Sequence, residues 1–186
     1  MVLATVTARE RGATDRLLED VVARLGGDGV RVLGALRPNA RQGGDADGYT
    51  HCESNLRLLP HGPVVRITQD LGAGSAACRM DAGALEEVVG IATARLDAEG
   101  ADLVVLNKFG IREAEGHGFR TLIAEALARR VPVLIGLSDT HRAAFEHFAD
   151  GMATALPPER DAVLAWCRKG LGTLETRLLA QQGNRP

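Results

Sequence analysis

The sequence predicts a three-layer α/β domain with a mainly parallel sheet and a β-hairpin at one edge. Strand-length apolar runs alternate with segments of helical periodicity along the 186 residues, which is typical of a parallel sheet covered by helices on both faces. A strand, a helix and a second strand fit within residues 1–36, about the length of one βαβ unit. Pro60, Gly62 and Pro63 separate two β-capable runs and predict the hairpin.

The first half of the chain supplies four strands and two helices of this domain. Thr14 is expected to cap the first helix, and Asp81 the second. Strands are expected at 2–7 and 30–36, and the hairpin strands at 50–59 and 64–68.

The second half alternates in the same way. A strand at 103–106 is expected to end in a polar loop at Asn107, and a helix to begin near Gly118. A strand at 131–137, a helix at 140–148, a short strand at 152–156 and a helix after Pro158 follow. A single domain over 1–179 with a frayed tail at 180–186 is therefore predicted.

Net charge, the length of the apolar runs and the cysteine spacing argue against several classes of partner and site. The net charge is −2 and no basic block is present, so nucleic acid is not an expected partner. The apolar runs are far shorter than the roughly 20 residues that span a bilayer, and the first eleven residues lack a signal-peptide core. We expect a cytoplasmic protein without a membrane partner. The three cysteines show no CxxC spacing and predict neither a disulfide framework nor a zinc site.

The turn after the first strand, residues 9–16, stands where a nucleotide-binding protein has its P-loop. Gly12 is its only glycine and it contains no lysine, so the GxxxxGK[ST] motif is absent. Arg9 and Arg11, with the positive end of the following helix, could still hold an anion. An ordinary solvated turn is the alternative.

Two glycine-containing loops follow. Residues 45–53 contain Asp, His, Cys and Glu, but neighbouring residues of a strand point to opposite faces, so they do not predict a metal site. A loop that closes over a ligand, or a plain surface loop, fits better. In the second loop, Gly72, Gly74, Ser75 and Arg79 could form an anion cradle or an ordinary turn. Cys78 there could be a reactive or an inert thiol.

The stretch 107–120 is the strongest candidate site, because ligands of open α/β sheets bind beyond the carboxyl ends of the strands. Its candidate residues are polar side chains separated by glycines, namely Asn107, Lys108, Gly110, Arg112, Glu113, Gly116 and Arg120. Asn107 stands where a Walker B strand presents a magnesium-binding Asp. The cations favour an anion over a metal, although a solvated loop with internal ion pairs is the alternative. Ser138–His141 could join the site or could simply cap the next helix.

The blocks DGYTHCESNLRLLPHGP, ITQDLGAGSAACRMDAGALEE, DLVVLNKFGIREAEGHGFR and VPVLIGL resemble an uncharacterised bacterial family, a domain of unknown function. Its genes are typically found near molybdate-transport and molybdoenzyme genes. That family is similar to small P-loop nucleoside triphosphatases, in which an Asp-Glu-x-Gly-x-x-Glu block follows the apolar strand. Gly110 and Glu113 match this block, whereas Asn107 and Lys108 do not. The resemblance implies a P-loop-NTPase-like fold with degenerate Walker motifs and a role in handling molybdenum or tungsten.

Two functions are compatible with these residues. The first is binding of a small inorganic oxyanion, molybdate or tungstate, for storage, sensing or delivery. A homo-oligomer is compatible with this function. No catalytic residue, resident metal or other cofactor is predicted for it, and a nucleotide is the less favoured ligand. The second is a divergent nucleotide-binding phosphohydrolase or transferase, for which the sequence names neither nucleophile nor metal ligand. An inactive scaffold that binds a partner is a third.

Overall fold

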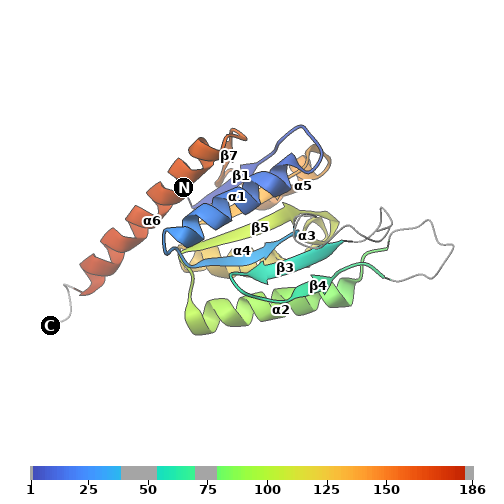
Figure 1. Cartoon of the computed structure of the whole chain (residues 1–186), viewed down its shortest axis with the longest axis horizontal. Coiled ribbons are helices and arrows are strands. Elements are labelled where there is room, and N and C mark those ends of the chain that lie inside the picture. Colours follow the sequence, from blue (N-terminus) through green and yellow to red (C-terminus); the bar gives the residue numbers. More distant parts are fainter. Residues whose placement is uncertain (1, 39–53, 70–78, 183–186) are drawn as a thin grey trace.

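The predicted three-layer α/β fold is confirmed. The structure, a computed structural model, describes residues 2–38, 54–69 and 79–182. They form a seven-stranded sheet between two layers of helices (Figure 1). The elements are β1 (Leu3–Val6), α1 (Ala13–Gly27), β2 (Val32–Leu36), β3 (Asn55–Leu59), β4 (Val64–Arg66), α2 (Ala82–Glu99), β5 (Leu103–Phe109), α3 (Ile111–Ala114), α4 (Arg120–Ala128), β6 (Val133–Leu137), the 3₁₀ helix η1 (Asp139–His141), α5 (Arg142–Ala149), β7 (Ala153–Leu156) and α6 (Arg160–Gln182).

The strand order is β4-β3-β2-β5-β6-β1-β7. The five strands from β2 to β7 in this order run parallel to one another, and β3 and β4 add an antiparallel hairpin at the edge. The predicted edge hairpin is therefore confirmed. The carboxyl ends of β1, β2, β5 and β6 lie along the same edge of the sheet, the one formed by strand ends and not by an edge strand. β3 begins at this edge because it is antiparallel to β2.

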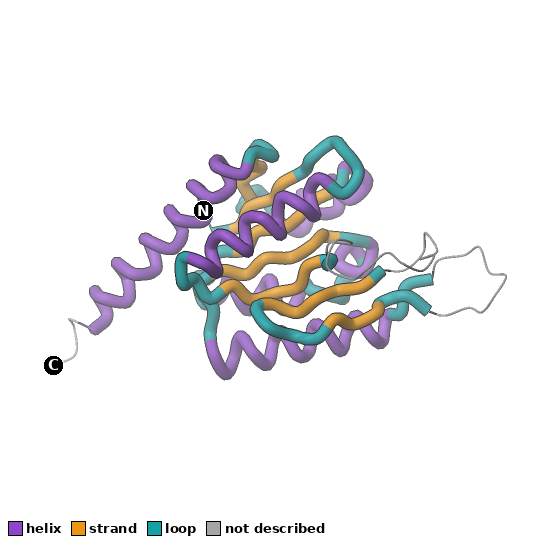
Figure 2. The backbone as a smooth tube through the Cα atoms, in the orientation of Figure 1, coloured by secondary structure: helices purple, strands orange, loops and turns teal. Residues whose placement is uncertain are grey.

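Helices cover both faces of the sheet, as the purple and orange parts of Figure 2 show, and they bury apolar side chains against it. On one face α1 and α6 contribute Leu18, Val21, Leu25, Val163, Leu164 and Cys167. On the other face α2, α4 and α5 contribute Leu85, Val88, Leu96, Leu122, Ile123 and Phe145. Buried strands therefore carry near-continuous apolar runs rather than an alternating pattern.

Two glycines let the strands on either side of β5 approach its backbone. A Cβ atom on Gly34 in β2 would lie 2.0 Å from the carbonyl oxygen of Val105, and Gly34 has a φ of +132°. A Cβ atom on Gly136 in β6 would lie 2.1 Å from the carbonyl oxygen of Asn107. No other residue type fits these two positions without displacing the backbone of β5.

Three boundaries differ from the sequence predictions. α1 begins at Ala13 with Gly12 as its N-cap, so the prediction that Thr14 caps it is wrong. β5 continues to Phe109, so Asn107 and Lys108 belong to the strand and not to a loop. α6 continues to Gln182, into the predicted tail, and its far part extends beyond the body of the domain (Figure 1). In contrast, the predicted cap of α2 is confirmed, because the Asp81 carboxylate accepts a hydrogen bond from the Ala84 N–H.

We predict that Gly34→Ala lowers the free energy of unfolding by about 3 kcal/mol or more, because the new methyl group overlaps the β5 backbone and the positive φ strains alanine. Gly90→Ala is the matched control. Gly90 lies on the exposed side of α2, and a Cβ atom there meets no atom within 4 Å. It should gain roughly 0.4–1 kcal/mol from helix propensity. Chemical denaturation of both variants measures the difference, and equal stabilities would show that β2 and β5 are not packed as described.

Candidate functional site

The predicted site lies at the sheet edge where β1, β2, β5 and β6 end. The turn after β1 and the end of β5 meet there, because Thr14 and Asn107 both lie against Gly136 of the intervening strand β6. The Thr14 Cγ2 atom would be 3.1 Å from a Cβ atom on that glycine. Two of the predicted candidate regions, far apart in the sequence, are thus side by side.

The turn after β1 keeps the spacing of a P-loop without its charged residue. With Gly12 as the second glycine of GxxxxGK[ST], the first glycine, the lysine and the Ser/Thr correspond to Thr7, Ala13 and Thr14. This register can be counted back from Gly12 in the sequence, although it was not predicted. Gly12 has a φ of +73° and no side chain caps α1.

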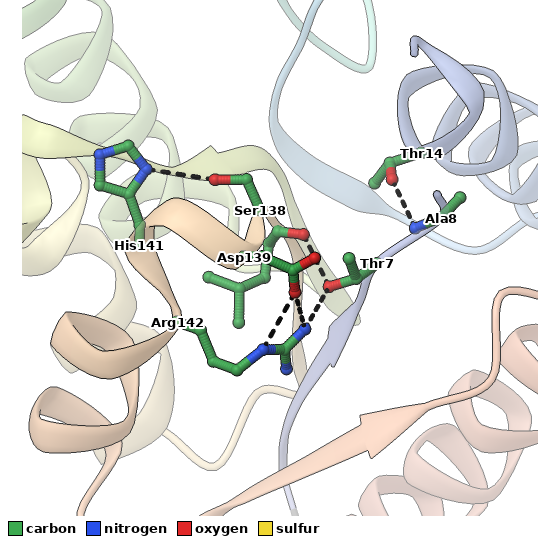
Figure 3. A network of polar contacts seen from close by, with 8 residues as sticks. Thr7, Ala8, Thr14, Ser138, Asp139, His141 and Arg142 are labelled. Carbon is green, nitrogen blue, oxygen red and sulfur yellow. Dashed lines mark hydrogen bonds and ion pairs between the residues drawn. The ribbon is translucent and has the colours of Figure 1, made fainter. Parts of the chain in front are cut away.

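The Thr14 hydroxyl is used within the turn. It accepts a hydrogen bond of 2.9 Å from the Ala8 N–H (Figure 3). In a P-loop NTPase the equivalent hydroxyl is a magnesium ligand. The predicted anion-binding residues Arg9 and Arg11 are exposed in this turn. The Arg16 guanidinium lies beside it, with Nη1 3.2 Å from the position that a Gly12 Cβ would take.

The ends of β1 and β6 are joined by a second polar network (Figure 3). The Thr7 hydroxyl donates to the Leu137 carbonyl at 2.6 Å. Arg142 at the start of α5 bonds the Asp139 carboxylate at 2.7 Å and reaches the Thr7 hydroxyl at 3.5 Å. Ser138 does not cap the following helix with its side chain, since its hydroxyl lies 3.2 Å from Nδ1 of His141.

Asn107, at the Walker B position, has a structural hydrogen bond. Its side chain is only 9% exposed, and its Oδ1 accepts a hydrogen bond of 3.3 Å from the Arg37 N–H at the end of β2. Lys108, the next residue, is exposed at the same edge. The end of β5 therefore carries the buried Asn107 amide, which bonds the backbone at the end of β2, and the exposed Lys108.

Glu113 closes the turn that follows β5. Its side chain is buried, and its two carboxylate oxygens accept hydrogen bonds from the Gly110 N–H at 2.8 Å and the Phe119 N–H at 3.0 Å. Gly118 packs against this carboxylate with a φ of +61°. The predicted site residue Glu113 thus holds the loop in shape, and both its oxygens already accept backbone hydrogen bonds.

The other candidate residues of this stretch are arranged around that turn. Arg112 pairs with Glu86 of α2 at 3.6 Å and with Glu115 at 3.2 Å. Arg120 donates to the Glu113 carbonyl and stacks 4.6 Å above the Phe148 ring. Gly116 is exposed, with a φ of +95°. Lys108 thus remains exposed where β5 ends, whereas Arg112 and Arg120 have protein partners.

Arg79 is the one candidate of the second glycine-containing loop that lies within the described residues. Arg79 is exposed, and its carbonyl accepts a hydrogen bond of 2.8 Å from the Gln69 N–H. Gly72, Gly74, Ser75 and Cys78 lie outside the described residues, as does the segment 45–53 that was considered for a metal. Within the described ranges no three His, Cys, Asp or Glu side chains are grouped as a metal site. Burial raises the pKa of the Cys167 thiol to about 12.

The sequence analysis did not single out Asp15, which lies in the first turn of α1. Desolvation by burial raises the pKa of its carboxyl group, and the nearby cations Arg37, Lys108 and Arg16 oppose that rise. An acidic residue in a first helical turn is common because it complements the helix dipole. Only the fold shows that this carboxylate lies among cations from three different segments.

A cavity of about 120 Å³ opens beside this edge. It lies between the hairpin and the turn after β5, and its lining is apolar toward the core and polar toward Lys108. The lining residues are Ser54, Leu56, Ile67, Met80, Leu85, Asn107, Lys108, Gly110, Ile111, Arg112, Glu113, Phe119 and His141.

Comparison with known proteins gives the family. The family described as "Protein of unknown function (DUF2478)" matches residues 3–166. The chain belongs to this family. It is also 33% identical over 168 residues to a protein from Bradyrhizobium diazoefficiens named "Molybdenum import ATP-binding protein ModC 2". The match covers 89% of the chain and 18% of that relative, so the chain spans about a fifth of the relative's length.

A solved structure supports the fold. The solution structure of a human cancer-related nucleoside triphosphatase matches with a TM-score of 0.58 and 15% identity over the whole of both chains. The DUF2478 chain therefore has a fold similar to that of this nucleoside triphosphatase. None of its described helices combines the length and apolarity needed to cross a bilayer.

We predict that Asp15→Asn stabilises the protein at pH 7. The raised pKa means that folding favours the protonated carboxyl group, so this stability is present below pH 3.8 and lost as the pH rises through the folded-state pKa. Asparagine stays neutral at every pH. The difference in free energy of unfolding between the variant and the parent should therefore be larger at pH 7 than at pH 3. Asp20→Asn, an exposed position on the same helix, is the control. A difference that grows toward low pH would contradict the desolvation of Asp15.

Proposed function

We propose that this protein binds a small doubly charged oxyanion, molybdate or tungstate, at the sheet edge formed by the α1 N-terminus and the end of β5. The observation that carries the proposal concerns two side chains, those of Thr14 and Asn107. Both occupy magnesium-holding positions of a P-loop NTPase. Both oxygens instead accept backbone hydrogen bonds, from Ala8 and Arg37.

Loss of those two ligands argues against ordinary nucleotide hydrolysis. Magnesium requires hard, preferably charged oxygen ligands in octahedral geometry, and Asn107 supplies no charge. The P-loop lysine that would contact the β- and γ-phosphates is replaced by Ala13. The remaining positive charge lies on the exposed Arg9 and Arg11 in the turn and on Lys108 at the end of β5.

The same edge is suited to a compact anion. Its cations come from separate segments, with Arg9, Arg11 and Arg16 around the first turn, Arg37 after β2 and Lys108 at the end of β5. No side chain caps α1, which leaves backbone N–H groups of its first turn for a ligand or water. An oxyanion requires several such donors at once, since desolvation of a double charge is costly.

The relative from Bradyrhizobium supports the choice of anion. Its name contains molybdenum import, and molybdenum is imported into cells as an oxyanion of the kind proposed here. Tungstate has the same shape and charge as molybdate, so this site is expected to accept both. Asp15 lies among the cations, and its carboxylate would be the group that opposes binding.

We predict that calorimetric titration detects molybdate and tungstate binding and no binding of ATP or GTP with magnesium. Lys108→Ala should weaken the binding of both oxyanions about tenfold or more, as expected for a lost hydrogen bond to a charged group. Lys169→Ala, which removes the only other lysine, on α6, is the matched control and should leave affinity unchanged.

Two outcomes would overturn this proposal. Absence of binding to molybdate, tungstate, sulfate and phosphate would contradict an oxyanion site. Magnesium-dependent phosphate release from ATP or GTP, lost in Lys108→Ala and kept in Lys169→Ala, would establish the alternative, a divergent nucleotide phosphohydrolase.

A further inference from the structure

The cavity beside β5 has a composition that a bare inorganic anion does not require. Its inner wall consists of Leu56, Ile67, Met80, Leu85 and Phe119, all members or neighbours of the apolar core. Ile111 stands on its lining with 53% of the residue exposed. An exposed large apolar residue next to an apolar hollow is a common feature of ligand sites.

The size of the hollow indicates what fits. Protein interiors contain few voids larger than a water molecule, and a volume of about 120 Å³ corresponds to roughly four waters. An engineered apolar cavity of about 150 Å³ stays dry and binds benzene. The cavity is thus of the scale of one aromatic ring or one short branched chain.

Arg112 is the second cation on the lining. Its two terminal nitrogens pair with Glu86 and Glu115. Its Nε is buried with no hydrogen-bond acceptor among the described residues. A buried N–H without an acceptor destabilises the protein by roughly 1–3 kcal/mol.

The charged groups of the lining favour an anion. Lys108 is exposed at its polar side, where the buried Asn107 and the half-buried His141 also line the cavity. The one carboxylate on the lining, Glu113, has both oxygens occupied by backbone N–H groups. The cavity therefore combines an apolar wall with donors at one end.

We infer that this cavity binds a small organic anion. Its compact apolar body would lie against Met80 and Phe119, and its anionic oxygens would contact Lys108 and Arg112. This site goes beyond the inorganic oxyanion proposed above, and the cation that it shares with that proposal is Lys108. An organic anion at Lys108 would compete with molybdate for the same cation.

The experiment compares phenyl phosphate with inorganic phosphate by calorimetry, since the two probes share the anionic group and differ by one aromatic ring. Phenyl phosphate should bind about 10- to 100-fold more tightly, which corresponds to burial of one ring. Met80→Gln, a polar residue of similar length at a half-buried position, should remove most of that advantage and leave the affinity for inorganic phosphate unchanged.

Met152→Gln is the matched control, because Met152 is 56% exposed and is not part of the cavity lining. It should retain the full preference. Equal affinities for the two probes would overturn this inference, as would a preference that Met80→Gln leaves intact. Molybdate binding together with equal affinities for the two probes would leave the oxyanion proposal standing alone. Preferential binding of phenyl phosphate without molybdate binding would support the organic-anion site and contradict the oxyanion proposal.

Discussion

The fixed position of the β5 carboxyl end is the constraint on which the site depends. Gly34 on one side and Gly136 on the other let the neighbouring strands contact the β5 backbone, and the Asn107 amide bonds the end of β2. Gly136 also accommodates Thr14, so the first turn of α1 sits directly over the same strands. Lys108 is therefore presented beside α1 by backbone packing. The glycines and the Asn107 amide, which are uncharged, fix the end of β5, and the charged Lys108 remains at the surface for a ligand.

The turn after β5 extends this arrangement. The buried Glu113 carboxylate accepts two backbone hydrogen bonds, from the N–H groups of Gly110 and Phe119, which are nine residues apart along the chain. Gly110 and Glu113 match the pattern that the chain resembles, whereas Asn107 and Lys108 differ from it. A structural carboxylate can persist where a catalytic one is lost, because the folded turn requires it whether or not metal is bound.

Much of the fold could be predicted from the sequence, because buried parallel strands leave apolar runs such as 103–106 and a cap such as Asp81 has a local signature. The edge hairpin was predicted from Pro60, Gly62 and Pro63 for the same local reason. The continuation of β5 to Phe109 was not predicted, since Asn107 and Lys108 are polar and β5 pairs with β6 again at Phe109 only after a register shift. The Thr14 bond to Ala8 depends on the shape of the turn and has no signature in sequence spacing alone.

The sequence predicts a site beyond the end of β5, and the fold adds which of the candidate residues have protein partners. The strand-end rule places a ligand beyond β5, and Lys108 lies there. Arg112 and Arg120 were candidates because of their charge, and only the fold shows that Glu86 and the Phe148 ring are their partners. Asp15 and the apolar wall of the cavity were not recognised, because each depends on segments that meet only in three dimensions.

The most direct test of the oxyanion site is its location in a crystal soaked in tungstate, with data collected at the tungsten absorption edge. The account predicts one anomalous peak in contact with Lys108 and the first turn of α1. A peak elsewhere on the surface, or no peak at a tungstate concentration that saturates binding in solution, would contradict it.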